Sequence, residues 1–227
     1  STKFSFPGCE PIPQPADLVT LELTGELARL YQEYLAAMAE YEANKPNNPE
    51  AIAMLKGLAA KSVTVLGTAN VGQSGNEKLE EHLGDNSVRQ IKKGEVLQLK
   101  INRNANYGAD STGILLNIQN TKASEKKWSS QELVELIDSD SPLIEVRGAK
   151  WAFLDATDGP KYLITKKLNI GGHAALKGWA FGDNPSVSAN TGGTTVKAWT
   201  SLPPKTLFTH PGPGEDAAIS WICPEDG

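Results

Sequence analysis

The side chains that could support catalysis or metal binding are few and widely spaced. The three histidines are His82, His173 and His210. His82 lies in the charged segment EKLEEHLGD, which is typical of a solvated helix face and does not match the spacing of a zinc site such as HExxH. His173 follows two glycines in a predicted turn and His210 precedes a proline, so neither is flanked by a nucleophile motif. A Ser-His-Asp arrangement assembled from distant segments stays open as an alternative.

The acidic and glycine-rich segments do not match known ion or nucleotide motifs. A calcium loop needs oxygen ligands at several spaced positions and a terminal glutamate, which the segment from Asp155 to Asp158 lacks. Since this segment lies between the strand-like stretches KWAFLDA and KYLITKK, we predict a hairpin turn there. GGHAALKG and NTGGTT match neither a P-loop nor a dinucleotide fingerprint. Two cysteines, Cys9 and Cys223, make no cysteine-rich metal site, and whether they pair stays open. We predict no catalytic residue, no metal and no cofactor.

Tryptophan is the best remaining indication of a binding site. All five tryptophans lie in the C-terminal half of the chain, and Trp151, Trp179 and Trp199 occur in the similar pieces KWAF, KGWAF and KAW. Aromatic rings exposed on a sheet can stack on sugar rings, so these three are candidate residues for binding carbohydrate or another ligand. Burial in a β core would explain the same residues, and that alternative stays open.

The charge balance argues against a nucleic-acid partner. The 22 basic and 27 acidic residues give a net charge of −5, and only four of the basic residues are arginine. Phosphate backbones are bound mainly through arginine and lysine, so nucleic acid is not the expected partner. No apolar run approaches the roughly 20 residues needed to span a bilayer, so we predict no membrane span.

The elements that would position these residues begin with the segment 94–119, GEVLQLKINRNANYGADSTGILLNIQ. Apolar residues alternate with polar ones at Leu97, Leu99 and Ile101, and again at Ile114, Leu116 and Ile118. This period of two predicts a pair of antiparallel strands, joined by a polar loop, with one dry face and one wet face. We therefore expect Leu99 and Leu116 to face the core.

Two helices are predicted upstream of this strand pair, over residues 24–44 and from Pro49 onward. Their short connection predicts a helical hairpin. The first helix carries an apolar seam at a spacing typical of a core-facing or coiled-coil surface. The seam residues are Leu27, Tyr31, Tyr34, Met38 and Tyr41.

The two ends of the chain are rich in proline. Residues 1–16 contain four prolines, which favour an extended arm, and Phe4, Phe6 and Ile12 give this arm apolar surface to bury. From Leu143 onward, short strand-like segments are separated by glycine, asparagine and proline clusters, which is typical of a sandwich or barrel. Near the C-terminal end, AAISWIC is predicted to form an edge strand.

Together these patterns predict an α+β fold. An N-terminal helical hairpin would pack on a mainly antiparallel sheet, followed by a β-rich C-terminal half that is sandwich-like or barrel-like. We divide the chain into an extended arm (1–16), helices plus the central strand pair (17–125), and a β-rich region with a proline-rich acidic tail (126–227). The boundary near residue 125 is open, and a single domain is the alternative.

The functional prediction is a non-enzymatic structural subunit of a larger homo-oligomeric assembly, such as a virion-like or phage-like particle. The terminal arms would help to hold neighbouring copies together. The expected interface residues are Phe4, Phe6, Ile12, Tyr31, Tyr34, Met38 and Tyr41. Two alternatives stay open: a carbohydrate-binding or other ligand-binding module that uses exposed tryptophan, and a hydrolase whose site joins His173 or His210 to a carboxylate. The chain starts at Ser1, which we interpret as removal of an initiator methionine after cytoplasmic synthesis, with cleavage of a leader as the alternative.

Overall fold

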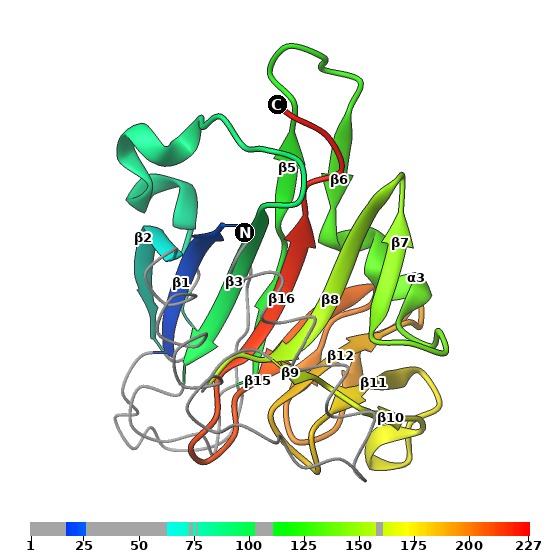
Figure 1. Cartoon of the computed structure of the whole chain (residues 1–227). Coiled ribbons are helices and arrows are strands. Elements are labelled where there is room, and N and C mark those ends of the chain that lie inside the picture. The colour runs from blue at the N-terminus through cyan, green and yellow to red at the C-terminus, as the bar shows by residue number, and fades with distance from the viewer. Residues whose placement is uncertain (1–16, 26–62, 73–74, 76, 103–110, 158–160) are drawn as a thin grey trace, which may run out of the picture.

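Two antiparallel sheets form the fold (Figure 1). The computed structural model describes residues 17–25, 63–72, 75, 77–102, 111–157 and 161–227. The larger sheet has the strand order β2-β1-β3-β16-β8-β7, and β9 also pairs with β8. In that order its strands are β2 (Val63–Val71), β1 (Asp17–Thr24), β3 (Val96–Asn102), β16 (Ala217–Ile222), β8 (Ala149–Asp155), β7 (Leu143–Val146) and β9 (Lys161–Tyr162).

The smaller sheet has the strand order β10-β11-β12-β15-β4. Its strands are β10 (Thr165–Lys167), β11 (Leu176–Ala180), β12 (Ser186–Asn190), β15 (Thr206–His210) and β4 (Thr112–Ile114). Two short ribbons accompany the sheets, formed by β5 (Asn117–Gln119) with β6 (Lys127–Ser129) and by β13 (Val196–Lys197) with β14 (Ser201–Leu202). The helical segments are η1 (Leu79–His82), η2 (Gly84–Ser87), η3 (Ser130–Glu132), α3 (Leu133–Leu136) and η4 (Ile170–Gly172).

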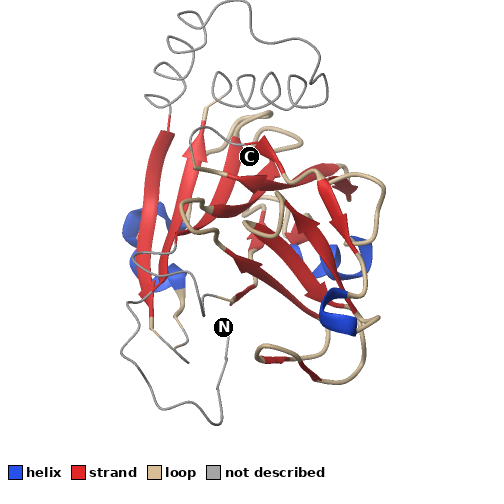
Figure 2. Cartoon of the chain, turned by 90° about the horizontal axis from the view of Figure 1, so that it is seen from below, coloured by secondary structure: helices blue, strands red, loops and turns tan. Residues whose placement is uncertain are grey.

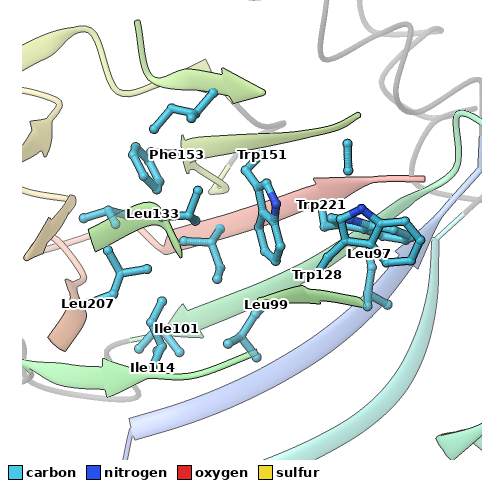
Figure 3. Close-up of a cluster of buried hydrophobic side chains, with 14 of the residues drawn as sticks. Leu97, Leu99, Ile101, Ile114, Trp128, Leu133, Trp151, Phe153, Leu207 and Trp221 are labelled. Atoms are coloured by element: carbon cyan, nitrogen blue, oxygen red, sulfur yellow. The ribbon is translucent and has the colours of Figure 1, made fainter. Parts of the chain in front are cut away.

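The core lies between the inner faces of the two sheets. Because successive side chains of a strand point to opposite faces, every second residue of each central strand enters this core. The larger sheet contributes residues such as Ile101, Phe153 and Ile219, and the smaller sheet contributes Val187 and Leu207. Figure 3 shows side chains from several strands meeting in this cluster. The cluster includes residues from both sides of the predicted boundary near residue 125.

The predicted α+β class is wrong, because the described residues are β-rich (Figure 2). Within them α3 is the only α-helix, and it has four residues. The strands begin upstream of the predicted helices: Val19, Leu21 and Leu23 alternate with polar residues in β1 and are buried. The segments predicted to form the helical hairpin lie outside the described residues. No helix in the described part of the chain is long and apolar enough to cross a membrane.

The two strands predicted within residues 94–119 do not pair with each other. β3 pairs with β1 and β16 in the larger sheet, whereas β4 pairs with β15 in the smaller one. The apolar alternation of the second segment is divided between β4 and β5. Leu99 does face the core, and Leu116 is half-buried against it. The alternation identified buried side chains, but two strands can share one core from opposite sheets as well as by direct pairing.

The segment AAISWIC forms β16, which is a central strand and not the edge strand that was predicted. It pairs with β3 on one side and β8 on the other. Both faces of β16 are buried: Ile219 and Trp221 enter the main core, and Ala218 and Ser220 are buried on the opposite face. Proline-rich flanks suggested an edge, but the prolines fall outside the paired residues and do not interrupt the ladder.

The Ser129 hydroxyl accepts a hydrogen bond from the backbone N–H of Gln131, so Ser129 caps the short helical segment that ends near Ile137. The predicted hairpin after KWAFLDA is confirmed. β8 and β9 pair as a hairpin, with Asp155 opposite Lys161. The Asp155 carboxylate accepts hydrogen bonds from the backbone N–H and the hydroxyl of Thr157, which is typical of a turn.

The outer face of the larger sheet, predicted to be wet, carries buried polar side chains. Glu22, Gln98 and Ser220 lie directly opposite one another on β1, β3 and β16. The Gln98 amide donates to the Glu22 carboxylate at 3.3 Å, and the Ser220 hydroxyl donates to the Gln98 amide oxygen at 3.1 Å. Lys100 pairs with Glu22 at 2.9 Å and with Asp216 at 3.9 Å. We call these five residues the polar ladder.

Candidate ligand-binding pocket

A pocket of about 490 Å³ opens on the outer face of the smaller sheet. Its floor comes from β12 and β15, through Ser186, Ser188, Phe208 and His210. One wall is Trp199, from the loop that joins β13 to β14. We call this hollow the Trp199 pocket.

Strand alternation explains why polar residues reach this pocket. On β12, Val187 and Ala189 are fully buried in the core, so Ser186 and Ser188 project from the opposite face. On β15, Leu207 enters the same core, and Phe208 and His210 therefore reach the outer face together with the serines of β12.

The ribbon of β13 and β14 covers the other part of this outer face. Leu202 of the ribbon forms a second apolar cluster with Leu176 and Phe208, which are buried beneath it. Ile170, Val196 and Ala198 pack against this cluster. The pocket is thus the part of the sheet face that the ribbon leaves uncovered.

Trp199 is held in one orientation although half of its surface is exposed. Its exposed fraction is 50%. The indole N–H donates to the Ser111 hydroxyl at 2.9 Å, and the ring meets Phe208 edge-on with 6.3 Å between centroids. A fixed aromatic ring at the edge of a hollow loses little conformational entropy when a ligand packs against it.

Burial disfavours the charged form of His210. Its Nδ1–H donates to the backbone carbonyl of Pro211 at 2.7 Å, a bond that assigns the proton to Nδ1. Burial lowers the pKa of His210 below its usual value, and the hydrogen bond to Pro211 opposes this shift only in part. Burial therefore favours the neutral imidazole, which contributes polarity to the pocket.

The remaining polar groups lie at the mouth. Lys167 and Asp183 form an ion pair at 3.3 Å, and the Asp183 side chain is fully exposed. The Ser186 hydroxyl donates to the Asn184 amide oxygen at 3.0 Å. The pocket thus combines hydroxyl and amide groups with one aromatic face, and its two formal charges offset each other.

Of the three tryptophans predicted to bind ligand, only Trp199 offers a ring to solvent. Trp151 is completely buried, and Trp179 is 5% exposed with its indole N–H bonded to the backbone oxygen of Ile137. Both belong to the core between the sheets. The predicted interface residues of the arm and the helical seam lie outside the described residues: Phe4, Phe6, Ile12, Tyr31, Tyr34, Met38 and Tyr41.

Neither the other two histidines nor Cys223 lines the Trp199 pocket. His82 is exposed on η1 and lies 3.7 Å from the Glu77 carboxylate. His173 follows η4 and is half-buried. Cys223 has a buried free thiol that donates to the Glu225 carbonyl at 2.9 Å, and Cys9 lies outside the described residues. Among the described residues, no group of three or more His, Cys, Asp or Glu side chains is arranged to hold a metal ion.

The hydrogen bonds in the Trp199 pocket differ from those of a Ser-His-Asp triad. In a triad, a carboxylate accepts from the histidine Nδ1–H and the serine hydroxyl donates to the imidazole. Here the Nδ1–H of His210 bonds to a backbone carbonyl, and the Ser186 hydroxyl donates to Asn184. The hydrolase alternative stays a prediction without support from these contacts.

Sequence reasoning missed the polar floor of the pocket. Neither β12 nor β15 was predicted, although SVSAN and TLFTH both alternate between apolar and polar residues. That alternation was the available signal. It was weak because alanine and threonine stand at inward positions where larger aliphatic residues are more usual.

Comparison with known proteins adds no family. No protein-family model matches the chain, and no curated protein or solved structure matches it.

Proposed function

We propose that this protein is a non-catalytic binding module and that the Trp199 pocket takes a sugar ring of an uncharged carbohydrate. The observation that carries the proposal is the half-exposed, hydrogen-bonded indole of Trp199 at the wall of a hollow floored by serine and histidine. The proposal follows one of the alternatives that the tryptophan pattern raised.

The size and chemistry of the pocket support a small polar ligand with an apolar face. Its volume of about 490 Å³ lies within the roughly 300–1,000 Å³ that is usual for small-molecule sites. A sugar ring has one face of C–H groups, which packs on an aromatic ring, and a rim of hydroxyls that both donate and accept. Ser186, Ser188 and Asn184 can serve such hydroxyls in both directions.

The charge of the pocket favours an uncharged sugar over an acidic one. Lys167 is the only lysine or arginine among the described residues that line the pocket, and Asp183 pairs with it. An acidic sugar would have to compete with Asp183 for the Lys167 ammonium group. A neutral sugar meets no such competition.

The test is binding of neutral oligosaccharides of glucose, xylose, mannose and N-acetylglucosamine, screened on an array and then measured by calorimetry. We expect at least one to bind, and we expect Trp199→Ala to weaken that binding at least tenfold. Trp199→Phe should keep part of the affinity, because a smaller aromatic face remains. Leu136→Ala, which removes an exposed apolar side chain on α3, is the matched control and should bind as the parent does.

Two results would contradict the proposal. One is the absence of binding to every oligosaccharide in the panel. The other is binding that Trp199→Ala leaves unchanged while circular dichroism shows both proteins folded.

A second candidate function is the structural subunit of a homo-oligomeric particle, and one observation favours it. Three large apolar side chains are 40–53% exposed beside the ends of β10 and β11, at one edge of the smaller sheet, namely Ile164, Leu168 and Phe181. Exposed apolar side chains at one edge of a sheet can mark a protein interface. The arms that were predicted to join neighbouring copies stay a prediction, since residues 1–16 lie outside the described part.

The native mass in solution tests this second candidate. A particle subunit should form a defined oligomer by light scattering, and Phe181→Asp should reduce its mass because a charge would then lie at the contact. A monomer at high protein concentration would exclude assembly through this edge and would leave the Trp199 pocket as the remaining site.

A further inference from the structure

Two further hollows lie end to end along the inner face of β1 and β3. One has a volume of about 210 Å³ and the other of about 370 Å³. Both are lined by Leu21, Leu83, Leu116 and Asn117, so they lie next to each other on the two sides of these residues. We call the two hollows together the β1–β3 groove.

The groove exists because the larger sheet extends past the smaller one. β12 and β15 pack over β8 and β16, near the middle of the larger sheet. The inner faces of β1 and β3 are covered by η1, by the edge strand β4 of the smaller sheet and by the segment that links β4 to β5. The two hollows lie between this cover and the side chains of β1 and β3.

The β3 wall of the groove is aliphatic, Trp128 and Trp221 line one end, and polar side chains such as Asn86 and Asn117 line part of the remaining wall. Leu97, Leu99 and Ile101 follow one another along β3 (Figure 3). Trp128 and Trp221 close the Leu97 end, with 5.2 Å between their ring centroids. From Leu97 to Ile101 the strand rises four residues, or about 13 Å at roughly 3.3 Å per residue. The shape is therefore long and narrow.

Few charged side chains line the groove within the residues described. Glu77, Lys78 and Glu80 line the larger hollow, and Arg89 and Glu225 line the smaller one. Acidic groups equal or outnumber basic ones in each hollow. A ligand with an anionic head group would therefore meet no net attraction in either hollow.

We propose that the β1–β3 groove binds a single unbranched hydrocarbon chain with an uncharged polar head, such as a long-chain alcohol. A linear chain fits two narrow hollows that share a junction, whereas a compact ring would fill only one. The two hollows have volumes of about 210 Å³ and about 370 Å³, which leaves room for an alkyl chain beside the apolar side chains of β3. This site is separate from the Trp199 pocket, which opens on the outer face of the other sheet.

The test uses 11-bromo-1-undecanol, whose bromine quenches tryptophan fluorescence on contact. We expect saturable quenching of the intact protein, with competition by 1-undecanol. In a series from 1-octanol to 1-undecanol, each added methylene should raise the affinity about threefold to fourfold, because each buries further apolar surface.

Leu116→Trp should lower the affinity for 11-bromo-1-undecanol at least tenfold, because the larger side chain fills the junction. Leu136→Trp places the same side chain at an exposed position of α3, away from the groove, and should bind as the parent does. The chain-length series uses the unmodified protein, so it remains decisive if Leu116→Trp does not fold. Quenching that never saturates, affinity that does not rise with chain length, or equal binding by folded Leu116→Trp would overturn the proposal.

Discussion

The outer faces of the two sheets both carry polar side chains, but they use them differently. On the larger sheet, Glu22, Gln98 and Ser220 are at most 9% exposed and hydrogen-bond one another. On the smaller sheet, Ser186 and His210 lie at a hollow of about 490 Å³ beside the half-exposed Trp199. The polar side chains of the larger sheet hydrogen-bond to one another. Those of the smaller sheet line a space that a ligand can enter.

This difference separates a stabilising role from a binding role. A buried polar group is costly unless it is paired, so the polar ladder should contribute to stability only while every member is present. Polar groups around a hollow are hydrated when it holds only water, and losing one of them should cost little stability. We therefore expect stability effects on the larger sheet and binding effects on the smaller one.

The largest effect is expected for Lys100→Met. This change removes the ammonium group that lies between Glu22 and Asp216, whose side chains are 11% and 13% exposed. Two carboxylates would then share a mostly buried site without a cation, and the expected loss in the free energy of unfolding is about 2–3 kcal/mol. Urea unfolding at pH 7 measures it.

The control is Lys167→Met on the smaller sheet. Lys167 also pairs with one carboxylate, but the Asp183 side chain is fully exposed. Exposed ion pairs contribute roughly 0–1 kcal/mol, so this variant should be close to the parent in stability. Equal losses in the two variants would show that the two faces do not differ in the way proposed.

The sequence allowed many of the strands to be predicted, but not how they are arranged. Alternation at Leu97, Leu99 and Ile101 reports only that one face is buried, and it holds for any pairing partner. The partners of β3 are β1 and β16, and β16 lies about 120 residues away along the chain. Pairing at that separation depends on the whole core, which no local pattern encodes.

The candidate site was harder to predict than the fold. Trp151, Trp179 and Trp199 stand in similar local sequences, but the first two point into the core and the third lies in the loop between two short strands. The alternation that buries Leu207 also places His210 on the opposite face of β15, at the pocket. The identity of these two residues does not show how much of that outer face other elements cover. The β13–β14 ribbon determines which part of the outer face of the smaller sheet is covered. The position of this ribbon depends on tertiary packing.

A matched pair of serine changes sharpens the comparison with a smaller effect. Ser220→Ala removes a fully buried hydroxyl and leaves the Gln98 amide oxygen without that donor. The expected loss is about 1–2 kcal/mol, because the remaining acceptor stays buried. Ser186→Ala on the smaller sheet should change stability by less than about 0.5 kcal/mol, as is usual for a position that water can reach. Urea midpoints with unchanged slopes would measure both, and a larger loss for Ser186→Ala would reverse the assignment of roles.

The smallest effect concerns the pH dependence of stability, through Asp216 beside Lys100. Burial raises the pKa of the Asp216 carboxyl above its ordinary value of 3.8, although Lys100 and a hydrogen bond from Asn102 oppose the shift. The folded protein therefore binds this proton more tightly than the unfolded chain does. Linkage then requires the Asp216 contribution to be most favourable below pH 3.8 and to decline as the pH rises above that value through the folded-state pKa.

Asp216→Asn removes this titration while keeping the side-chain shape. The free energy of unfolding of the parent, relative to that of Asp216→Asn, should therefore fall as the pH rises from about 3.8. Asp183→Asn is the control on the smaller sheet, since its carboxylate is fully exposed. Unfolding curves for the parent, Asp216→Asn and Asp183→Asn, recorded as the pH rises from about 3.8, measure these free energies of unfolding. A difference between parent and Asp216→Asn that grew with pH would mean that the attraction of Lys100 exceeds the cost of burial, so that the polar ladder holds Asp216 mainly as a paired ion.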